Sequence, residues 1–167
     1  LCVSDDAAVE AVLWGKNGAG PALVEGSLVI DCSTISPATS QQMAQRLAKR
    51  GVGYLDTPVT GGTEGANAGT LTVLCGGNDA DLDRAMPVLE TIGGSIHHFG
   101  AVGSGQQVKA VNQVLVAGSY AAVAEAIALG QHLQLPMEQV VAALVGGAAG
   151  SWALQHRSGA MLADQYP

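Results

Sequence analysis

The chain has 167 residues, of which 48% are hydrophobic and 13% are charged, and its formal net charge is −7 at pH 7. This length suffices for a packed domain with a sizeable core, and the apolar content excludes an intrinsically disordered chain. Seven Lys plus Arg residues without a basic cluster argue against nucleic acid or an anionic membrane surface as a partner. We therefore expect a soluble globular protein with no nucleic-acid partner and no membrane partner.

The cysteines and histidines give no sign of a disulfide framework or a metal site. Cys2, Cys32 and Cys75 are odd in number and widely spaced in apolar runs, a pattern that favours reduced thiols in a cytoplasmic protein. His97 and His98 are adjacent in an expected strand, so their side chains point to opposite faces. We expect no metal ion.

Strands and helices alternate over the first hundred residues. Short apolar runs predict strands that end at residue 3 and that span residues 28–32, 53–58, 70–76 and 95–99. Helices are expected at residues 7–13 and 38–50, and a third is capped by Asn78 or Asp79 and ends near residues 93–94. Such alternation predicts an α/β fold in which helices cover a mostly parallel sheet.

After Gly103 the strand signal stops. A long helix is predicted over residues 106–134, followed by shorter helices at 136–145 and 151–162. The most apolar part of the long helix, residues 114–129, falls short of the ~20 apolar residues of a membrane span. We therefore expect the long helix to be a core helix. The chain thus divides into an α/β domain, residues 1–101, and an all-helical domain, residues 102–167.

Polar residues stand at the ends of the expected strands. Ser33 and Thr34 follow one strand, and the glycine-rich segment 59–66 follows the next. In open α/β sheets ligands bind at the carboxyl ends of the strands, and a glycine-rich turn exposes amides suited to a carboxylate or phosphate. Capping of the following helix is the alternative role for the two hydroxyls, and an ordinary loop is the alternative for the glycines.

Lys109 lies in the first turns of the long helix, with Asn112 and Gln113 three and four residues further on, so the three polar side chains share a face. Lysine is seldom fully buried without a partner. Lys109 is therefore either a rim lysine whose stem covers apolar surface or part of a site.

Four stretches, taken in order, resemble the β-hydroxyacid dehydrogenase family, to which 6-phosphogluconate dehydrogenase is a distant relative. They are D-C-S-T-I-S-P at 31–37; D-T-P-V-T-G-G at 56–62 with residues 65–66 and 69–72; G-S-G-Q at 103–106 with Lys109 and Asn112; and residues 146–147 with 150–151. The resemblance implies a hydride transfer between NAD(P)H and a small carboxylate-bearing aldehyde or 3-hydroxy acid, of the 3-hydroxyisobutyrate or tartronate semialdehyde type.

The resemblance also implies roles for single residues. Lys109 would be the general acid/base, and Asn112 would orient the substrate. The substrate carboxylate would be held by Thr60, Gly61 and Gly62. Thr60 stands where serine is usual in the family, which keeps the hydroxyl.

Thr34, with Ser33 beside it, would touch the nicotinamide cofactor, NAD or NADP. The resemblance further implies a Rossmann-type first domain and a homo-oligomer, a dimer or tetramer formed through the helical domain. The family's opening Gly-x-Gly-x-x-Gly unit and the end of its helical domain have no counterpart here, so we expect a piece of a longer polypeptide that is inactive by itself. A non-catalytic NAD(P)-binding or oligomerisation module is the alternative; such relatives lose the lysine that is present here as Lys109.

Overall fold

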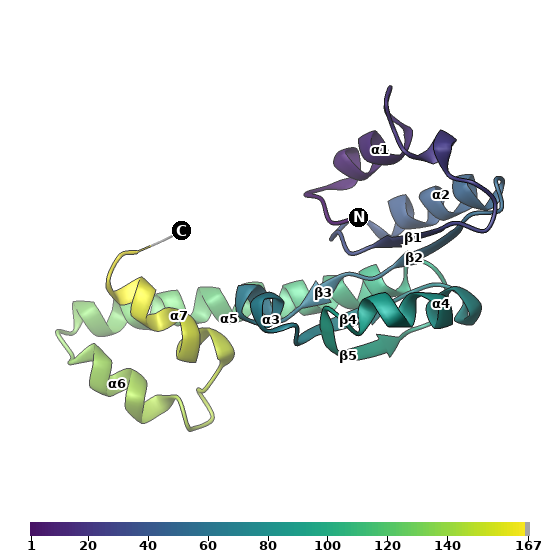
Figure 1. Ribbon diagram of the computed structural model, residues 1–167. Helices are drawn as coiled ribbons and strands as arrows, with labels where there is room; N and C mark the ends of the chain where they lie inside the picture. Colours follow the sequence, from purple (N-terminus) through teal and green to yellow (C-terminus); the bar gives the residue numbers. More distant parts are fainter. Residues whose placement is uncertain (166–167) are drawn as a thin grey trace. The chain divides into compact units, whose positions relative to one another are not determined.

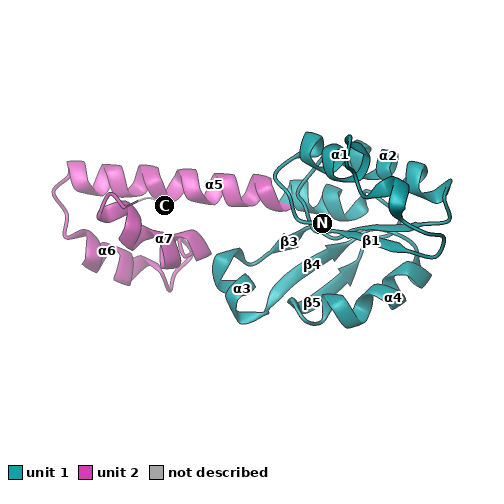
Figure 2. Ribbon diagram, turned by 45° about the horizontal axis from the view of Figure 1, so that its top comes forward, with its two compact units in different colours: residues 1–111 teal, residues 112–167 magenta. Residues whose placement is uncertain are grey.

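The computed structural model describes residues 1–165, and the chain forms two compact units, Leu1–Val111 and Asn112–Pro167 (Figure 2). The first unit contains α1 (Asp6–Trp14), the 3₁₀ helix η1 (Gly20–Ala22), β1 (Leu28–Asp31), α2 (Pro37–Ala48), β2 (Gly53–Asp56), β3 (Val59–Thr60), α3 (Gly62–Ala68), β4 (Leu71–Cys75), α4 (Asp79–Leu89) and β5 (Gly93–His98) (Figure 1). The long helix α5 (Ser104–His132) leads into the second unit, which also contains α6 (Met137–Leu144) and α7 (Trp152–Leu162).

Most strand pairs of the first unit are parallel. β1 pairs with β2 so that Asp31 lies opposite Asp56, and β4 pairs with β5. A pair of backbone hydrogen bonds between Asp56 and Gly76, 3.0 and 2.8 Å long, joins the two sheets. Residues 1–3 contact β1 through backbone bonds without forming a regular strand. The predicted α/β class with a mostly parallel sheet is confirmed.

The expected glycine-rich turn at residues 59–66 is instead a short strand followed by a short helix. Val59 and Thr60 are β-branched residues, which favour strands, and they pair antiparallel with Val73 and Thr72. The strand cannot continue, because Gly61 has a φ of +131°, and α3 begins at the next residue. The segment therefore reverses direction at the edge of the sheet.

Side-chain caps fix where α1 and α4 begin, and the cap of α4 is one of the two residues that the sequence predicts. The Asp5 carboxylate accepts the Ala8 N–H at 2.7 Å at the start of α1, and the Asn78 side chain accepts the Asp81 N–H at 2.8 Å at the start of α4. The end of α4 differs from the prediction: the helix stops at Leu89, because β5 begins at Gly93 and the chain needs the intervening residues to turn.

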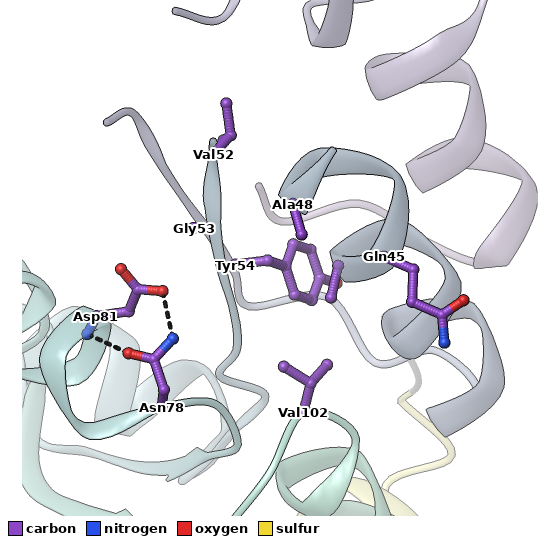
Figure 3. Close-up of a pocket in the computed structure, with 9 residues that line it drawn as sticks. Gln45, Ala48, Val52, Gly53, Tyr54, Asn78, Asp81 and Val102 are labelled. Carbon is purple, nitrogen blue, oxygen red and sulfur yellow. Dashed lines mark hydrogen bonds between the residues drawn. The ribbon is translucent and has the colours of Figure 1, made fainter. Parts of the chain in front are cut away.

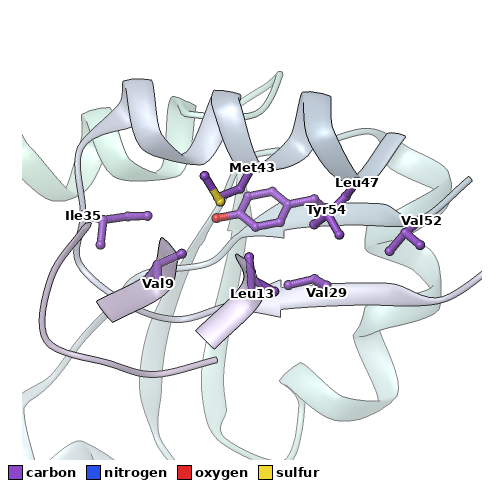
Figure 4. Packing of buried hydrophobic residues seen from close by; sticks show 8 residues of the cluster. All are labelled: Val9, Leu13, Val29, Ile35, Met43, Leu47, Val52 and Tyr54. Carbon is purple, nitrogen blue, oxygen red and sulfur yellow. The ribbon is translucent and has the colours of Figure 1, made fainter. Parts of the chain in front are cut away.

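Two apolar clusters form the core of the first unit. One packs α1 and α2 against β1 and β2, with the side chains pointing toward one another (Figure 4); its buried members are Val9, Leu13, Val29, Ile35, Met43, Leu47, Val52 and Tyr54. The other packs α4 against the strands and consists of Leu55, Val73, Cys75, Ala85 and Leu89. Together the clusters bury much of β1, β2 and β4, whereas β5 is largely exposed.

Helix α5 differs from the expected core helix. It is long and apolar enough to cross a membrane by length and composition alone, yet only 17% of its most apolar window is buried. In the described part of the second unit, Val123 and Ile127 pack against Ala153 and Leu154. Most other apolar side chains of α5 are exposed, because α6 and α7 cover one face of the helix.

Leu47 is 0% exposed in the first cluster, so we expect Leu47→Ala to lower the free energy of unfolding by about 2–5 kcal/mol through lost burial and a cavity. Urea denaturation followed by circular dichroism measures this change. Val24→Ala, at a position that is 71% exposed, is the control and should shift stability by no more than about 0.5 kcal/mol. Equal shifts for both variants would contradict the assignment of this core.

Candidate functional site

Lys109 is held against the backbone of β3. The residue is 9% exposed, and Nζ donates a hydrogen bond to the Val59 carbonyl oxygen at 2.7 Å. Burial lowers the pKa of the Lys109 amine below its ordinary value, because a low-dielectric surrounding disfavours the charged form. The Nζ of Lys109 is thus bonded to the protein backbone, whereas the ammonium of a rim lysine faces water.

A buried carboxylate determines where the helix that carries Lys109 begins. Asp56, at the end of β2, is fully buried and accepts the backbone N–H of Gly103 at 2.7 Å and that of Gln106 at 2.9 Å. Burial raises the pKa of Asp56, and these two hydrogen bonds oppose the rise. A side chain at Gly105 would overlap the Leu74 carbonyl oxygen, which explains why α5 needs glycine at this position.

The segment after β1 is also fixed from inside the protein. Asp31 is fully buried and accepts the Ser33 N–H at 3.0 Å and the Tyr54 hydroxyl at 2.8 Å. Burial is the main cause that raises the pKa of Tyr54, with the neighbouring Asp31 charge adding to it, so the phenol keeps its proton as donor to Asp31.

The two hydroxyls predicted to meet the cofactor lie in different surroundings. Ser33 is buried, and its Oγ accepts the Val3 N–H at 2.9 Å, so this hydroxyl holds residues 1–3 beside β1. Thr34 is exposed. Of the pair, only Thr34 presents its side chain to a molecule outside the protein.

The three residues predicted to hold a carboxylate directly follow Val59, whose carbonyl oxygen accepts the hydrogen bond from Lys109. Thr60 ends β3 and is half-buried, whereas Gly61 and Gly62 are exposed at positive φ angles of +131° and +66°. Glycine adopts such angles without the steric cost that a side chain would bring. The structure therefore brings the Lys109 ammonium to the segment that the sequence singles out.

Asn112 stands three residues beyond Lys109 on α5 and so shares its helix face. Its Nδ2 donates to Gln113 Oε1 at 3.0 Å. Asp56 and Gln106 were not assigned roles from the sequence, although both belong to the stretches that carry the family resemblance; their partners lie far away along the chain and leave no periodic signal.

A crevice of about 310 Å³ lies elsewhere in the first unit, between α2, β2 and the start of α4 (Figure 3). Asp81 at its wall accepts hydrogen bonds from Asn78 Nδ2 at 2.7 Å and Arg84 at 2.8 Å. None of the predicted site residues lines it. The Asp81 carboxylate already has partners within the protein. The crevice therefore gives no sign of a second site.

Two models of known protein families together match the whole chain. A family model described as the NAD binding domain of 6-phosphogluconate dehydrogenase matches residues 1–103. A second, described as NAD-binding of NADP-dependent 3-hydroxyisobutyrate dehydrogenase, matches residues 103–167.

Individual relatives agree with these family matches. The chain is 44% identical over 153 residues to an uncharacterized oxidoreductase of Synechocystis sp., covering 92% of this chain and 53% of the relative. It is 38% identical over 155 residues to 2-hydroxy-3-oxopropionate reductase of Escherichia coli, covering 93% and 53%. The crystal structure of 3-hydroxyisobutyrate dehydrogenase from Salmonella typhimurium matches with a TM-score of 0.92 at 31% identity, covering 99% of this chain and 57% of that one. The chain spans about half the length of the curated relatives it matches.

Because Asp56 accepts two N–H groups with a carboxylate, we expect Asp56→Asn to leave one of them facing an amide NH₂ group. The free energy of unfolding should fall by about 1–3 kcal/mol, the usual cost of an unpaired buried donor. Urea denaturation measures the loss, and hydrogen exchange at the Gln106 amide should become faster. Asp83→Asn, at an exposed carboxylate of α4, is the matched control, and equal behaviour of the two variants would refute the capping role.

Proposed function

Because the chain belongs to the β-hydroxyacid dehydrogenase family, we propose that it forms part of an oxidoreductase acting on small acids. The enzyme transfers a hydride between NAD(P)H and a carboxylate-bearing aldehyde or the corresponding 3-hydroxy acid. The observation that carries this proposal is the buried Lys109 amine, held at the backbone of β3 beside the exposed Gly61 and Gly62.

The cofactor is NAD or NADP, since both matched family models are NAD-binding domains. The exposed Thr34 hydroxyl fits a contact with it, because Thr34 follows β1 at the carboxyl edge of the sheet, where ligands of open α/β sheets bind. When bound, the cofactor supplies or accepts the hydride. Ser33 lies beside it as a buried residue whose hydroxyl accepts the Val3 N–H.

Lys109 handles the proton. Reduction of an aldehyde builds negative charge on the carbonyl oxygen, and an ammonium within hydrogen-bond reach delivers the proton that neutralises this charge. In the oxidative direction the neutral amine accepts the hydroxyl proton. Burial lowers the Lys109 pKa, which increases the fraction of neutral amine at a given pH.

The substrate carboxylate is held by the amides of Gly61 and Gly62 and the Thr60 hydroxyl, while Asn112 orients the reacting end. Backbone amides suit an anion better than a neutral alcohol. Two similar proteins are named for small acids of this kind, 2-hydroxy-3-oxopropionate and 3-hydroxyisobutyrate, and we propose a substrate of that class.

We further propose a cytoplasmic homo-oligomer that associates through the helical domain. The support is the exposed apolar surface of α5, where Val114 and Leu115 are 73% and 70% exposed, because large exposed apolar patches mark interaction sites. A non-catalytic module of the same fold is the second candidate. The buried amine of Lys109 favours the enzyme, because titratable groups with perturbed pKa values cluster at functional sites.

Replacement of the proposed acid/base tests the function directly. In the full-length protein, Lys109→Ala should reduce turnover by about 10²–10⁴-fold, the usual contribution of a positioned proton donor. NAD(P)H absorbance with 2-hydroxy-3-oxopropionate as substrate, and NAD(P)⁺ reduction with 3-hydroxyisobutyrate, measure the effect. Lys49→Ala, at an exposed lysine after α2, is the control; a Lys109→Ala form as fast as the parent protein would end the proposal.

The pH profile gives an independent test. Since oxidation needs the neutral amine, kcat/KM for the 3-hydroxy acid should rise with pH along a limb whose pKa lies below the ordinary lysine value of 10.5. Lys109→Arg should abolish this limb, because a guanidinium does not deprotonate in proteins. A limb that persists in the Lys109→Arg form would assign the titration to another group.

A further inference from the structure

Gln106 is a buried polar side chain that the proposed mechanism does not use. It is 1% exposed. Its Nε2 donates to the Ser33 carbonyl oxygen at 2.7 Å, and its Oε1 accepts the Ile35 N–H at 3.2 Å. Its own backbone N–H donates to Asp56. One residue at the start of α5 is thus bonded to the segment after β1 and to the end of β2.

The side-chain amide of Gln106 behaves like a peptide group of a neighbouring strand. It pairs with the carbonyl of Ser33 and the N–H of Ile35, two groups that face the same side of the segment. The neutral side-chain amide carries a donor and an acceptor on one rigid plane, which matches these two groups. A carboxylate or a hydrocarbon of the same size cannot satisfy both partners.

This pairing fixes the residue that lies between the two bonded ones. Ser33 and Ile35 are buried, and Thr34 between them is exposed, so the amide of Gln106 is bonded to the backbone on both sides of Thr34. In the other direction, Lys109 lies three residues further along α5, about one turn away on the same helix face.

We infer that Gln106 is a positioning residue that holds the cofactor-contacting Thr34 segment at a fixed distance from the Lys109 amine. The inference rests on the proposed function, because it takes the roles of Thr34 and Lys109 from there. Hydride transfer to a carbonyl carbon and proton transfer to its oxygen need both groups placed together, and a misplacement of about 1 Å costs on the order of 10²-fold in rate.

Two variants of similar size separate positioning from simple loss of packing. Gln106→Glu keeps an acceptor for Ile35, but an ionised carboxylate opposes the Ser33 carbonyl; once protonated, its O–H donates to that carbonyl and restores the pairing. Gln106→Met keeps most of the volume and has no titratable group. The pairing therefore recovers in acid in the first variant and stays lost in the second.

The experiment uses the full-length enzyme at about pH 5.5 and about pH 8, a range across which a buried carboxyl with a raised pKa gains its proton. NADH and NADPH binding is measured by fluorescence titration, and kcat by absorbance. We expect Gln106→Glu to lose about tenfold or more in cofactor affinity and in kcat at the higher pH and to recover most of both at the lower pH. Gln106→Met should be impaired at both. Gln107→Glu, at the exposed neighbouring position, is the matched control and should follow the parent protein.

The buried carboxylates Asp31 and Asp56, bonded to the Ser33 and Gln106 backbone amides, are present in every variant, so the pH profile of the parent protein is the reference for all of them. A Gln106→Glu form that behaves like the parent protein, or whose loss is the same at both pH values, would overturn the inference. Failure of the proposed function is distinct: a parent protein that binds the cofactor but turns over no small acid, or a Lys109→Ala form that is fully active, would show it.

Discussion

The rest of the first unit depends on the hydrogen bonds that the buried Asp56 carboxylate accepts from the start of α5. The carboxylate accepts the N–H groups of Gly103 and Gln106 at the start of α5, where the positive end of the helix dipole favours a negative charge. A desolvated carboxylate without such partners would be costly. The sheet must therefore present Asp56 where α5 begins, and the lack of a side chain at Gly105 allows the helix to come that close.

Side-chain hydrogen bonds connect α5 to the sheet at two further points. The Lys109 ammonium meets the Val59 carbonyl on β3, and the Gln106 amide pairs with the backbone after β1. Each tie joins a side chain of α5 to main-chain atoms at a strand end. The proposed proton donor, carboxylate-binding glycines and cofactor contact are consequently placed by one helix, and a small shift of its first turns would move all of them together.

The second unit poses a different physical problem. Its described residues bury Val123 and Ile127 against α7, whereas Val114, Leu115 and Leu129 stay exposed on the same helix. Exposed apolar side chains in this number are unfavourable in water unless something covers them. The proposed association of helical domains would cover them, and it would also explain why alanine and glycine, which let helices approach closely, are so frequent along α5.

The sequence by itself determined the alternation of strands and helices, the cap of α4, the helical position of Lys109 and the family, because these depend on local propensity, periodicity and short motifs. Only the tertiary structure decided that Val59 and Thr60 turn back against β4, that the Ser33 hydroxyl accepts the Val3 N–H, and that Gln106 reaches residues 71 and 73 positions away. Hydrogen bonds between a side chain and a distant backbone follow no period along the chain, so they become visible only when the segments are folded together.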